Sequence, residues 1–393
     1  MDTRDLMRGF PPPPEARVTL ANWRNAPFNR WAYRNVRQIV PTVRIRRASE
    51  VWQLERDIQP IERVAYSAPD GAGTTWGAFL AGSYTDGCVV FQRGRIVFER
   101  YDNGMAEDDT HILFSVTKSV SATLAGVLVE RGQLDPGAPV TRYVPEAKGS
   151  AFGTAKVRHV LDMTVGIKFV EDYHDTTGDF ARYREATGWN PVQSAKFLND
   201  MRSFLVTLKQ EGKHGEKYHY VSPCSDMLGW IMERASGVRF VELLERELWI
   251  PMGAEAQADL TLDPIGAPRT AGGLCTTTRD LARFGQMVLQ RGVANGRQVI
   301  PGSWIDDFRA NGDAKAWARG SKWLPGMRYR TKWYVLPGER GAFCGIGIHG
   351  QWLTIDPTSA VVIAKFSSDP EPSTDENDDR HLAAFDAISR ALG

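Results

Sequence analysis

Residues 112–132, ILFSVTKSVSATLAGVLVERG, carry the clearest structural signal in the chain. Apolar residues recur at helical spacing along 112–131, and Gly132 suits the C-cap because glycine readily adopts a left-handed conformation. A polar loop at 103–110 precedes the stretch. The pattern predicts a buried central helix that begins directly after a loop.

Ser115 and Lys118 stand near the start of this helix and form an S-x-x-K motif. Residues three apart share a helix face, so a desolvated lysine of lowered pKa could activate the serine hydroxyl. At a helix N-terminus, the N–H of Ser115 would also face an oxyanion. A helix-start serine beside a solvated lysine gives the same pattern, so the motif alone leaves both interpretations open.

Strand signals lie on both sides of a helical block. Residues 87–101, GCVVFQRGRIVFERY, predict a hairpin that turns at Gly94, and further strands are expected at 328–336, 345–355 and 360–367, the last two joined by a turn at 356–359. Helices are expected at 157–163, 191–209, 225–236, 240–248, 277–290 (with Thr277 or Thr278 as N-cap) and 381–392, and the acidic stretch 369–379 is expected to be a solvated loop.

This order predicts an α/β fold in which an antiparallel sheet is flanked by helices and interrupted by an all-helical domain. We expect residues 1–135 and 270–393 to form the two parts of the α/β domain, and residues 136–269 to form the helical domain. A cleft would lie between them. Its walls are expected from 166–189 and from the aromatic loop 310–330, which contains Trp317, Trp323 and Tyr329.

Tyr220 follows the polar loop 211–219 and is expected at a loop tip that enters the cleft. A phenol held near a lysine ammonium loses its proton more easily, so Tyr220 could act as a base toward Ser115 and then as an acid toward the leaving group. A core aromatic is the alternative interpretation.

Residues 345–350, GIGIHG, give the strand expected at 345–355 a glycine-rich start. Glycine weakens a strand unless another group approaches closely. A substrate carbonyl lying there could accept hydrogen bonds from the N–H groups of Ile348 and Ser115, which would form an oxyanion hole. A bulge at a sheet edge explains the glycines equally well.

Together these three elements resemble the β-lactamase-related serine hydrolases, whose penicillin-recognising fold is found in class C β-lactamases, DD-peptidases and related esterases. The resemblance covers 112–143, 157–167, 220–253, 272–289 and 345–367, and within the family the chain looks most like the 6-aminohexanoate-dimer hydrolases, through 29–32, 160–163, 171–173 and 345–351. It implies that Ser115 is the nucleophile, with Lys118 and Tyr220 as its partners. It also implies that Ile348 is the second oxyanion donor and that Tyr173 reaches toward the substrate amide.

Two departures from the family pattern bear on the substrate. Ser222 stands where the penicillin enzymes carry asparagine, and Gly345-Ile346-Gly347 replaces the Lys-Thr-Gly that receives the antibiotic's carboxylate. A carboxylate without a cation in a partly closed site is costly, so linear amides and esters are favoured over penicillins. With Tyr173, the residues Ser222, Gly347 and His349 are candidate substrate-binding residues.

Composition narrows the function further. The chain has 393 residues and a net charge of +1, which provides no long-range field for nucleic acid or an anionic membrane. No apolar stretch suggests a signal peptide or a membrane span, so a cytoplasmic location is expected. The four scattered cysteines are expected to be reduced, the histidines form no metal motif, and no cofactor is expected. For the oligomeric state, the sequence gives no specific signal, and a homodimer is expected by default.

The sequence therefore predicts a serine hydrolase that cleaves linear amides or esters through an acyl-enzyme. β-Lactamase or D-alanyl peptidase activity is one alternative, and a non-catalytic descendant that binds peptides is another. A Ser-His-Asp α/β-hydrolase is disfavoured because the chain contains no G-x-S-x-G motif.

Overall fold

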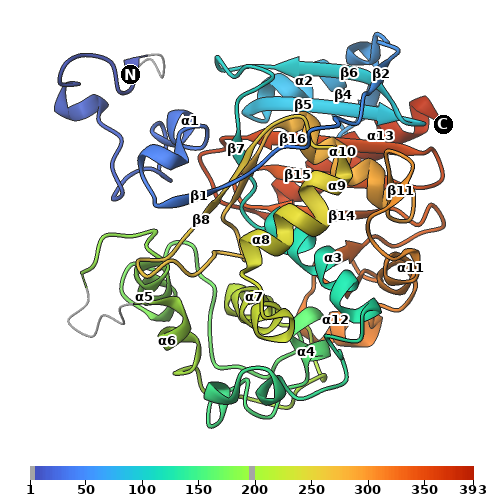
Figure 1. Ribbon diagram of the computed structural model, residues 1–393. Coiled ribbons are helices and arrows are strands. Elements are labelled where there is room, and N and C mark those ends of the chain that lie inside the picture. The colour runs from blue at the N-terminus through green and yellow to red at the C-terminus, as the bar shows by residue number, and fades with distance from the viewer. Residues whose placement is uncertain (1–4, 194–199) are drawn as a thin grey trace.

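A computed structural model describes residues 5–193 and 200–393 of the chain (Figure 1). Its main feature in these residues is an eight-stranded sheet, antiparallel except where β2 pairs with β6. The strand order is β12 (Arg328–Arg330), β13 (Trp333–Val335), β14 (Phe343–Gly347), β15 (Gln351–Asp356), β16 (Val361–Ser367), β5 (Thr85–Gln92), β6 (Arg95–Tyr101) and β2 (Glu55–Arg56).

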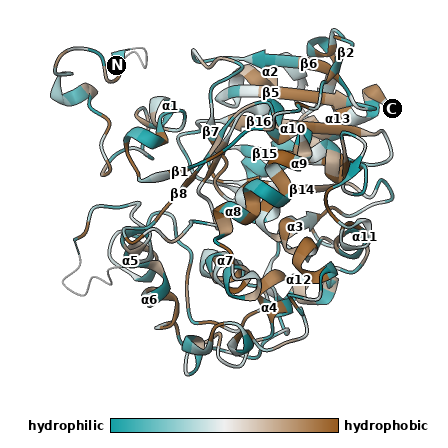
Figure 2. Ribbon diagram, viewed as in Figure 1, coloured by the Kyte–Doolittle hydropathy of each residue, from teal (hydrophilic) through white to brown (hydrophobic). Residues whose placement is uncertain are grey.

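Helices cover both faces of this sheet. On one face lie α2 (Trp76–Gly82) and α13 (Asp375–Leu392), and on the other lie α10 (Thr278–Leu289) and α3 (Val116–Glu130). Successive strand residues point to opposite faces, so Cys88 and Val90 of β5 join the cluster under α13, while Val89 and Phe91 join the larger core around α3 and α10. The central strands are among the most hydrophobic segments in Figure 2.

A second, four-stranded sheet joins the start of α3 to distant parts of the chain. Its order is β1 (Thr42–Ile45), β8 (Ala258–Thr261), β9 (Leu274–Thr276) and β7 (His111–Ile112). Because β7 ends three residues before Ser115 and pairs with β9, the start of α3 is held beside the loop that links β8 to β9. The remaining paired strands are β3 (Ala65–Ser67) with β4 (Gly73–Thr75), and β10 (Val293–Ala294) with β11 (Arg297–Gln298).

Helices α4 (Val157–Leu161), α5 (Asp179–Ala186), α6 (Met201–Leu205) and α7 (Ser222–Ser236) lie in the region below the sheets in Figure 1. Helix α8 (Phe240–Leu244), the π-helical turn η7 (Glu245–Trp249) and α9 (Ile250–Met252) follow in one run that contacts β1 and α10. The remaining helical elements are α1 (Asn29–Ala32), α11 (Gly302–Ala310), α12 (Ala314–Gly320) and the 3₁₀ turns Pro14–Ala16, Val36–Gln38, Ile61–Arg63, Val140–Arg142 and Pro145–Ala147. In the described part of the chain, no helix is long and apolar enough to span a bilayer.

Several local predictions are confirmed. The hairpin of β5 and β6 turns at Arg93 and Gly94, both with positive φ, and α3 is followed by Gly132 at φ +68°. Thr277 is the N-cap of α10, where its side chain accepts a hydrogen bond from the N–H of Asp280. The mixed α/β fold, with its largely antiparallel sheet flanked by helices, is also as predicted.

Other predicted boundaries are wrong. Residues 345–355 are not one strand, because β14 and β15 are separated by a tight turn in which His349 and Gly350 have positive φ. Residues 328–336 likewise form β12 and β13. Only the first part of the acidic stretch 369–379 is a loop, since α13 begins at Asp375, where acidic residues suit the positive end of a helix. Helix α7 begins at Ser222, and of the helix expected at 191–209 only α6 is found among the described residues, since 194–199 lie outside them.

Candidate active site

Ser115 and Lys118 lie together at the N-terminal end of α3. The chain turns sharply into the helix at Phe114, whose φ of +42° is unusual for a bulky residue. Lys118 Nζ donates to Ser115 Oγ over 2.6 Å and to the carbonyl of Ala271 over 2.7 Å. The predicted helical contact between amine and hydroxyl is therefore present, and a carbonyl from the β8–β9 loop fixes the direction of the amine.

Burial changes the protonation of this lysine. Lys118 is only 2% exposed, and burial lowers the pKa of its amine to about 7, with further lowering by Arg269 and Lys332 and opposition from Glu171 and Asp226. The alternative interpretation, in which the lysine is solvated, is therefore wrong. A substantial fraction of the amine is neutral near pH 7 and carries a lone pair.

Tyr220 lies against both groups. Lys118 Nζ is 5.0 Å from the centre of its ring, and a hydrogen bond with Ser115 acts to lower the pKa of the phenol. Burial outweighs that contact and holds the pKa well above its usual value. The expectation that the lysine would make this phenol easier to ionise is therefore wrong, and Tyr220 keeps its proton.

The glycine-rich strand packs against the start of α3. A Cβ at Gly347 would lie 2.5 Å from the carbonyl oxygen of Leu113 and 3.1 Å from Ser115 N, and one at Gly345 would lie 2.8 Å from Ser119 Oγ. The close approach that requires glycine is thus made by the protein's own backbone and side chains. This packing brings the turn after β14, with Ile348, to the N-terminus of α3.

A cavity of about 370 Å³ opens at these residues. The predicted site residues that line it are Ser115, Lys118, Tyr173, Ser222, Ile348 and His349. Tyr220 and Gly347 are not part of the lining, but each lies next to Ser115. Segment 166–189 forms one wall as predicted. Loop 310–330 does not line this cavity, because Trp317 and Tyr329 pack around Tyr218 at a separate hollow. The full lining is Arg24, Asn25, Ala26, Phe114, Ser115, Lys118, Glu171, Tyr173, His174, Phe180, Arg184, Trp189, Ser222, Arg269, Ala271, Gly272, Ile348, His349, Pro370, Glu371 and Pro372.

Glu171 is a site residue that the sequence patterns did not single out. Its carboxylate accepts hydrogen bonds from the Ser222 hydroxyl at 2.7 Å, from the Ser222 N–H, and from the Tyr173 hydroxyl at 2.9 Å. One acid thus holds two predicted substrate-binding residues in place. Its position two residues before Tyr173 is the signal that could have found it.

A buried ion pair holds Ala271, whose carbonyl accepts a hydrogen bond from Lys118. Arg269 pairs with Asp226, and the other oxygen of Asp226 accepts from the N–H of Ala271 at 2.8 Å. Tyr183 also donates to Asp226. No local pattern marks Arg269 or Asp226 as part of the site, because they come from segments far apart in the chain.

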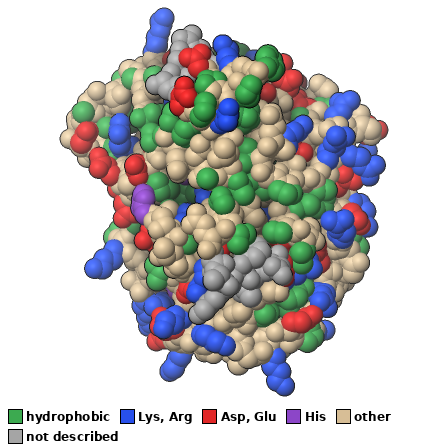
Figure 3. Space-filling view, turned by 90° about the vertical axis from the view of Figure 1, so that its left-hand side faces the viewer, with side chains coloured by type: hydrophobic (Ala, Val, Ile, Leu, Met, Phe, Trp, Pro, Cys, Tyr) green, Lys and Arg blue, Asp and Glu red, His purple; other side chains and the backbone are tan. Residues whose placement is uncertain are grey.

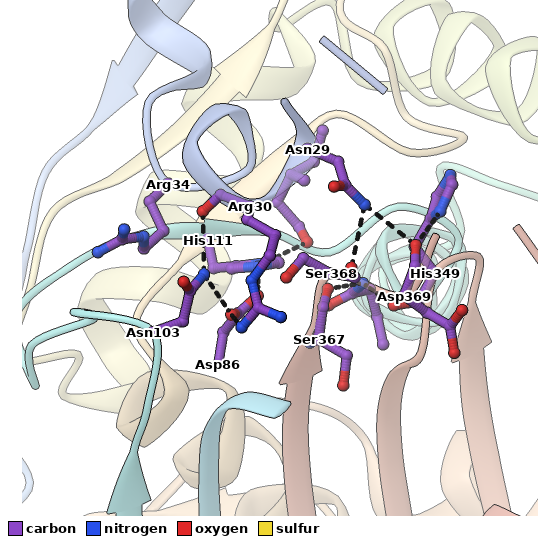
Figure 4. A network of polar contacts seen from close by, with 12 residues as sticks. Asn29, Arg30, Arg34, Asp86, Asn103, His111, His349, Ser367, Ser368 and Asp369 are labelled. Carbon is purple, nitrogen blue, oxygen red and sulfur yellow. Dashed lines mark hydrogen bonds and ion pairs between the residues drawn. The ribbon is translucent and has the colours of Figure 1, made fainter. Parts of the chain in front are cut away.

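His349 is held as a neutral ring. It is 4% exposed, and burial lowers its pKa to about 4. At neutral pH its Nδ1 therefore donates to the carbonyl of Asp369, at 2.8 Å. The same carbonyl accepts from Asn29 Nδ2, which ties the N-terminal arm, the described residues 5–41 before β1, to this side of the cavity (Figure 4).

Deeper in that network, Asn103 links the arm to the main sheet by donating to the carbonyl of Arg30 and to Asp86 (Figure 4). His111 Nε2 lies 3.3 Å from Asp86. Figure 3 shows the side of the molecule that carries the arm, where charged side chains lie mostly around the edge and hydrophobic ones gather across the middle. Among residues 5–193 and 200–393, no group of three or more potential metal ligands is found.

Comparisons with known proteins agree with this geometry. The family model described as Beta-lactamase matches residues 85–387. The chain is 36% identical over 381 residues to the 6-aminohexanoate-dimer hydrolase of Paenarthrobacter ureafaciens, a match that spans 95% of this chain and 94% of that protein.

Solved structures give the same result. A Bacillus anthracis protein provisionally named a 6-aminohexanoate-dimer hydrolase superposes with a TM-score of 0.88 and 26% identity, over 97% of this chain and 98% of that one. A class C β-lactamase shares the fold, with a TM-score of 0.57 and 16% identity over 80% of this chain and 93% of its own. The chain therefore belongs to the β-lactamase family and is a hydrolase of that fold.

Proposed function

We propose that this protein cleaves linear amide or ester bonds through an acyl-enzyme formed on Ser115. The observation that carries the proposal is the 2.6 Å contact between Ser115 Oγ and a buried lysine amine, inside a cavity large enough for a small substrate. With a pKa of about 7, Lys118 is matched to proton transfer at neutral pH.

In the proposed first step, neutral Lys118 takes the proton of Ser115 as Oγ bonds to the substrate carbonyl carbon. The charge that develops on the carbonyl oxygen is met by the N–H groups of Ser115 and Ile348. Neither group donates a hydrogen bond to another described residue, so both are free to serve as the oxyanion hole.

Collapse of this intermediate breaks the bond to the leaving nitrogen or oxygen, which must receive a proton. Tyr220, whose raised pKa keeps its phenol protonated, is suited to deliver that proton and to recover one from Lys118. Water then attacks the acyl-enzyme while Lys118 again accepts a proton, and the acid product leaves with Ser115 regenerated. Lys118 is thus the proposed base and Tyr220 the proposed acid.

The proposed substrates are open-chain. The relative from Paenarthrobacter ureafaciens is named for a linear amide dimer. In this chain Gly345 stands where penicillin enzymes carry the lysine that binds the antibiotic's carboxylate, and a Cβ at Gly345 would lie 2.8 Å from Ser119 Oγ, so a longer side chain there would require Ser119 to move. Tyr173 and Ser222, both held by Glu171, are the residues proposed to contact the amide.

The test is intact-protein mass spectrometry during turnover of 6-aminohexanoate dimer and short p-nitrophenyl esters. We expect a stoichiometric acyl adduct on the parent protein and none on Ser115→Ala, with turnover lowered by about 10³-fold or more. Full activity in a folded Ser115→Ala variant would overturn the proposal. D-alanyl peptides and nitrocefin complete the panel, and nitrocefin as the best substrate would contradict the choice of open-chain amides and esters.

A further inference from the structure

Three arginines line the cavity that holds Ser115. Arg269 is neutralised by Asp226, but Arg24 and Arg184 are bound differently. Arg24 donates to the carbonyl of Trp189 at 2.9 Å and to the side-chain oxygen of Asn190, and Arg184 donates to the carbonyls of Tyr173 and Asp175. In the part of the chain that the structure describes, neither guanidinium has a carboxylate within 4.0 Å.

Two guanidinium groups without a nearby carboxylate are energetically unfavourable in a cavity that holds no anion. Burial, and then the positive charge of Arg184, lower the pKa of Arg24 to about 9, with opposition from Tyr33 and a further lowering by Arg269. The pKa of Arg184 is lowered as well, although Asp175, Asp172 and Glu171 oppose the effect. Arg184 Nε is also buried without a hydrogen-bond partner.

The two acids on the cavity wall, Glu171 and Glu371, offset these charges only in part, because among the described residues neither lies within 4.0 Å of the Arg24 or Arg184 guanidinium group. Glu171 is occupied by Ser222 and Tyr173, and Glu371 is exposed. An anion placed between Arg24 and Arg184 would therefore gain attraction from both guanidinium groups in a partly desolvated site. An ammonium group in the same place would be repelled.

The cationic wall is also rigidly built. The Arg24 guanidinium stacks over the rings of Trp23 at 5.0 Å and Trp189 at 6.0 Å. Five residues further on, Asn29 Nδ2 donates to the carbonyls of Ser368 and Asp369, both at 3.0 Å, which fastens the arm beside His349 (Figure 4). Arg24 is therefore held at the cavity before any ligand arrives.

We propose that the cavity selects linear amides or esters that carry a free carboxylate, which binds between Arg24 and Arg184. The proposal rests on the proposed function of Ser115 and names the substrate class of that site. For a substrate with both an ammonium and a carboxylate end, such as a 6-aminohexanoate dimer, the carboxylate end faces the two arginines.

The test compares esters of equal chain length and the same leaving group: the mono-p-nitrophenyl ester of adipic acid, p-nitrophenyl hexanoate and p-nitrophenyl 6-aminohexanoate. A second series, N-hexanoyl-6-aminohexanoate against N-hexylhexanamide, places the carboxylate on the leaving half. We expect kcat/KM for the acidic member of at least one series to exceed its neutral counterpart by about tenfold or more, and this ratio to fall as NaCl is raised.

Variants locate the effect. Arg24→Gln and Arg184→Gln should each lower the acidic-to-neutral ratio by about tenfold, whereas Arg24→Lys should lower it less because the charge remains. Arg182→Gln is the matched control, since it removes the same charge from the exposed side of α5 and should leave the ratio unchanged. A variant that folds poorly lowers both rates and not their ratio.

Two results would overturn the inference: a ratio near one or below in both series, or a high ratio that survives in the Arg24→Gln, Arg184→Gln double variant. Both differ from failure of the proposed function, in which Ser115→Ala would continue to hydrolyse every member of the two series.

Discussion

Among the described residues, two buried lysines contact a serine hydroxyl, and of these two pairs the one at Lys118 lines the cavity described above. Lys118 contacts Ser115 at the start of α3, while Lys365 contacts Ser367 at the end of β16. Burial lowers the pKa of the two amines similarly, to about 7 and about 8. A depressed lysine pKa and a hydroxyl partner are thus not sufficient to define a nucleophile.

Access and backbone donors distinguish the pairs. Lys365 and Ser367 are both 0% exposed, and the amine also contacts the carbonyl of Ser83 and, at 3.2 Å, His381 Nε2. Ser115 instead lines the cavity, with Ile348 on the same wall. The pair at Lys365 fills the core under α2 and α13, and the pair at Lys118 faces a space in which a carbonyl can be held.

The largest expected difference comes from removing each amine. Lys118→Met should lower kcat/KM for a p-nitrophenyl ester by about 10³-fold, because the general base is lost. Lys365→Met should stay within about threefold of the parent, since its amine meets no substrate. Rates are to be compared after circular dichroism confirms that both variants are folded. Similar losses of kcat/KM in Lys118→Met and Lys365→Met would contradict the assignment of Lys118, and not Lys365, as the general base.

A smaller effect is expected at the contact that positions the oxyanion donors. Gly347→Ala should lower kcat by about a hundredfold with little change in KM, because its Cβ would displace β14 from the backbone of Leu113 and Ser115. Gly73→Ala is the control, since a Cβ there meets nothing within 4 Å. An unchanged kcat in Gly347→Ala would show that this approach is not needed for chemistry.

The pH dependence of activity should report only the pair at Lys118. This amine must be neutral to accept a proton, so kcat/KM should rise about tenfold per pH unit below its pKa of about 7 and level off above it. Lys365→Met should show the same profile. A flat profile between about pH 5 and 7 would contradict the assignment of Lys118 as base.

The pair at Lys365 should appear in stability instead. Lys365 has a folded pKa of about 8 and an ordinary value of 10.5, so between these values the unfolded chain binds more protons than the folded one. The free energy of unfolding should therefore rise with pH across this window, and part of that rise should be absent in Lys365→Met. Urea unfolding at a series of pH values measures it, and identical slopes in the parent and the variant would contradict a lowered pKa for this amine.

Local sequence patterns were enough to predict the parts of the fold that depend on near neighbours. The Ser115–Lys118 contact follows from helical spacing, the β5–β6 hairpin from its turn residues, and the Thr277 cap from the chemistry of helix starts. The division at residues 135 and 269 stays a prediction.

The parts that sequence missed depend on contacts between distant segments. The ion pair of Arg269 with Asp226 and the hydrogen bonds of Glu171 with Ser222 join helix α7 to two loops that no sequence periodicity relates to it. The turn after β14 was missed because His349 takes a left-handed conformation without the usual Asn-Gly signal. Burial, which sequence spacing cannot supply, reversed the expected shift of the Tyr220 pKa.

The N-terminal arm has a consequence for how such enzymes diverge. It supplies Arg24 to the cavity and is fastened through Asn29 to the carbonyls after β16, but it also packs on Phe114, next to Ser115, through Trp23 and Tyr33. Changes along the arm can therefore alter both which molecules fit and how firmly Ser115 is held. Grafting arms between related chains would then transfer selectivity only if the residues that face Phe114 were transferred with them.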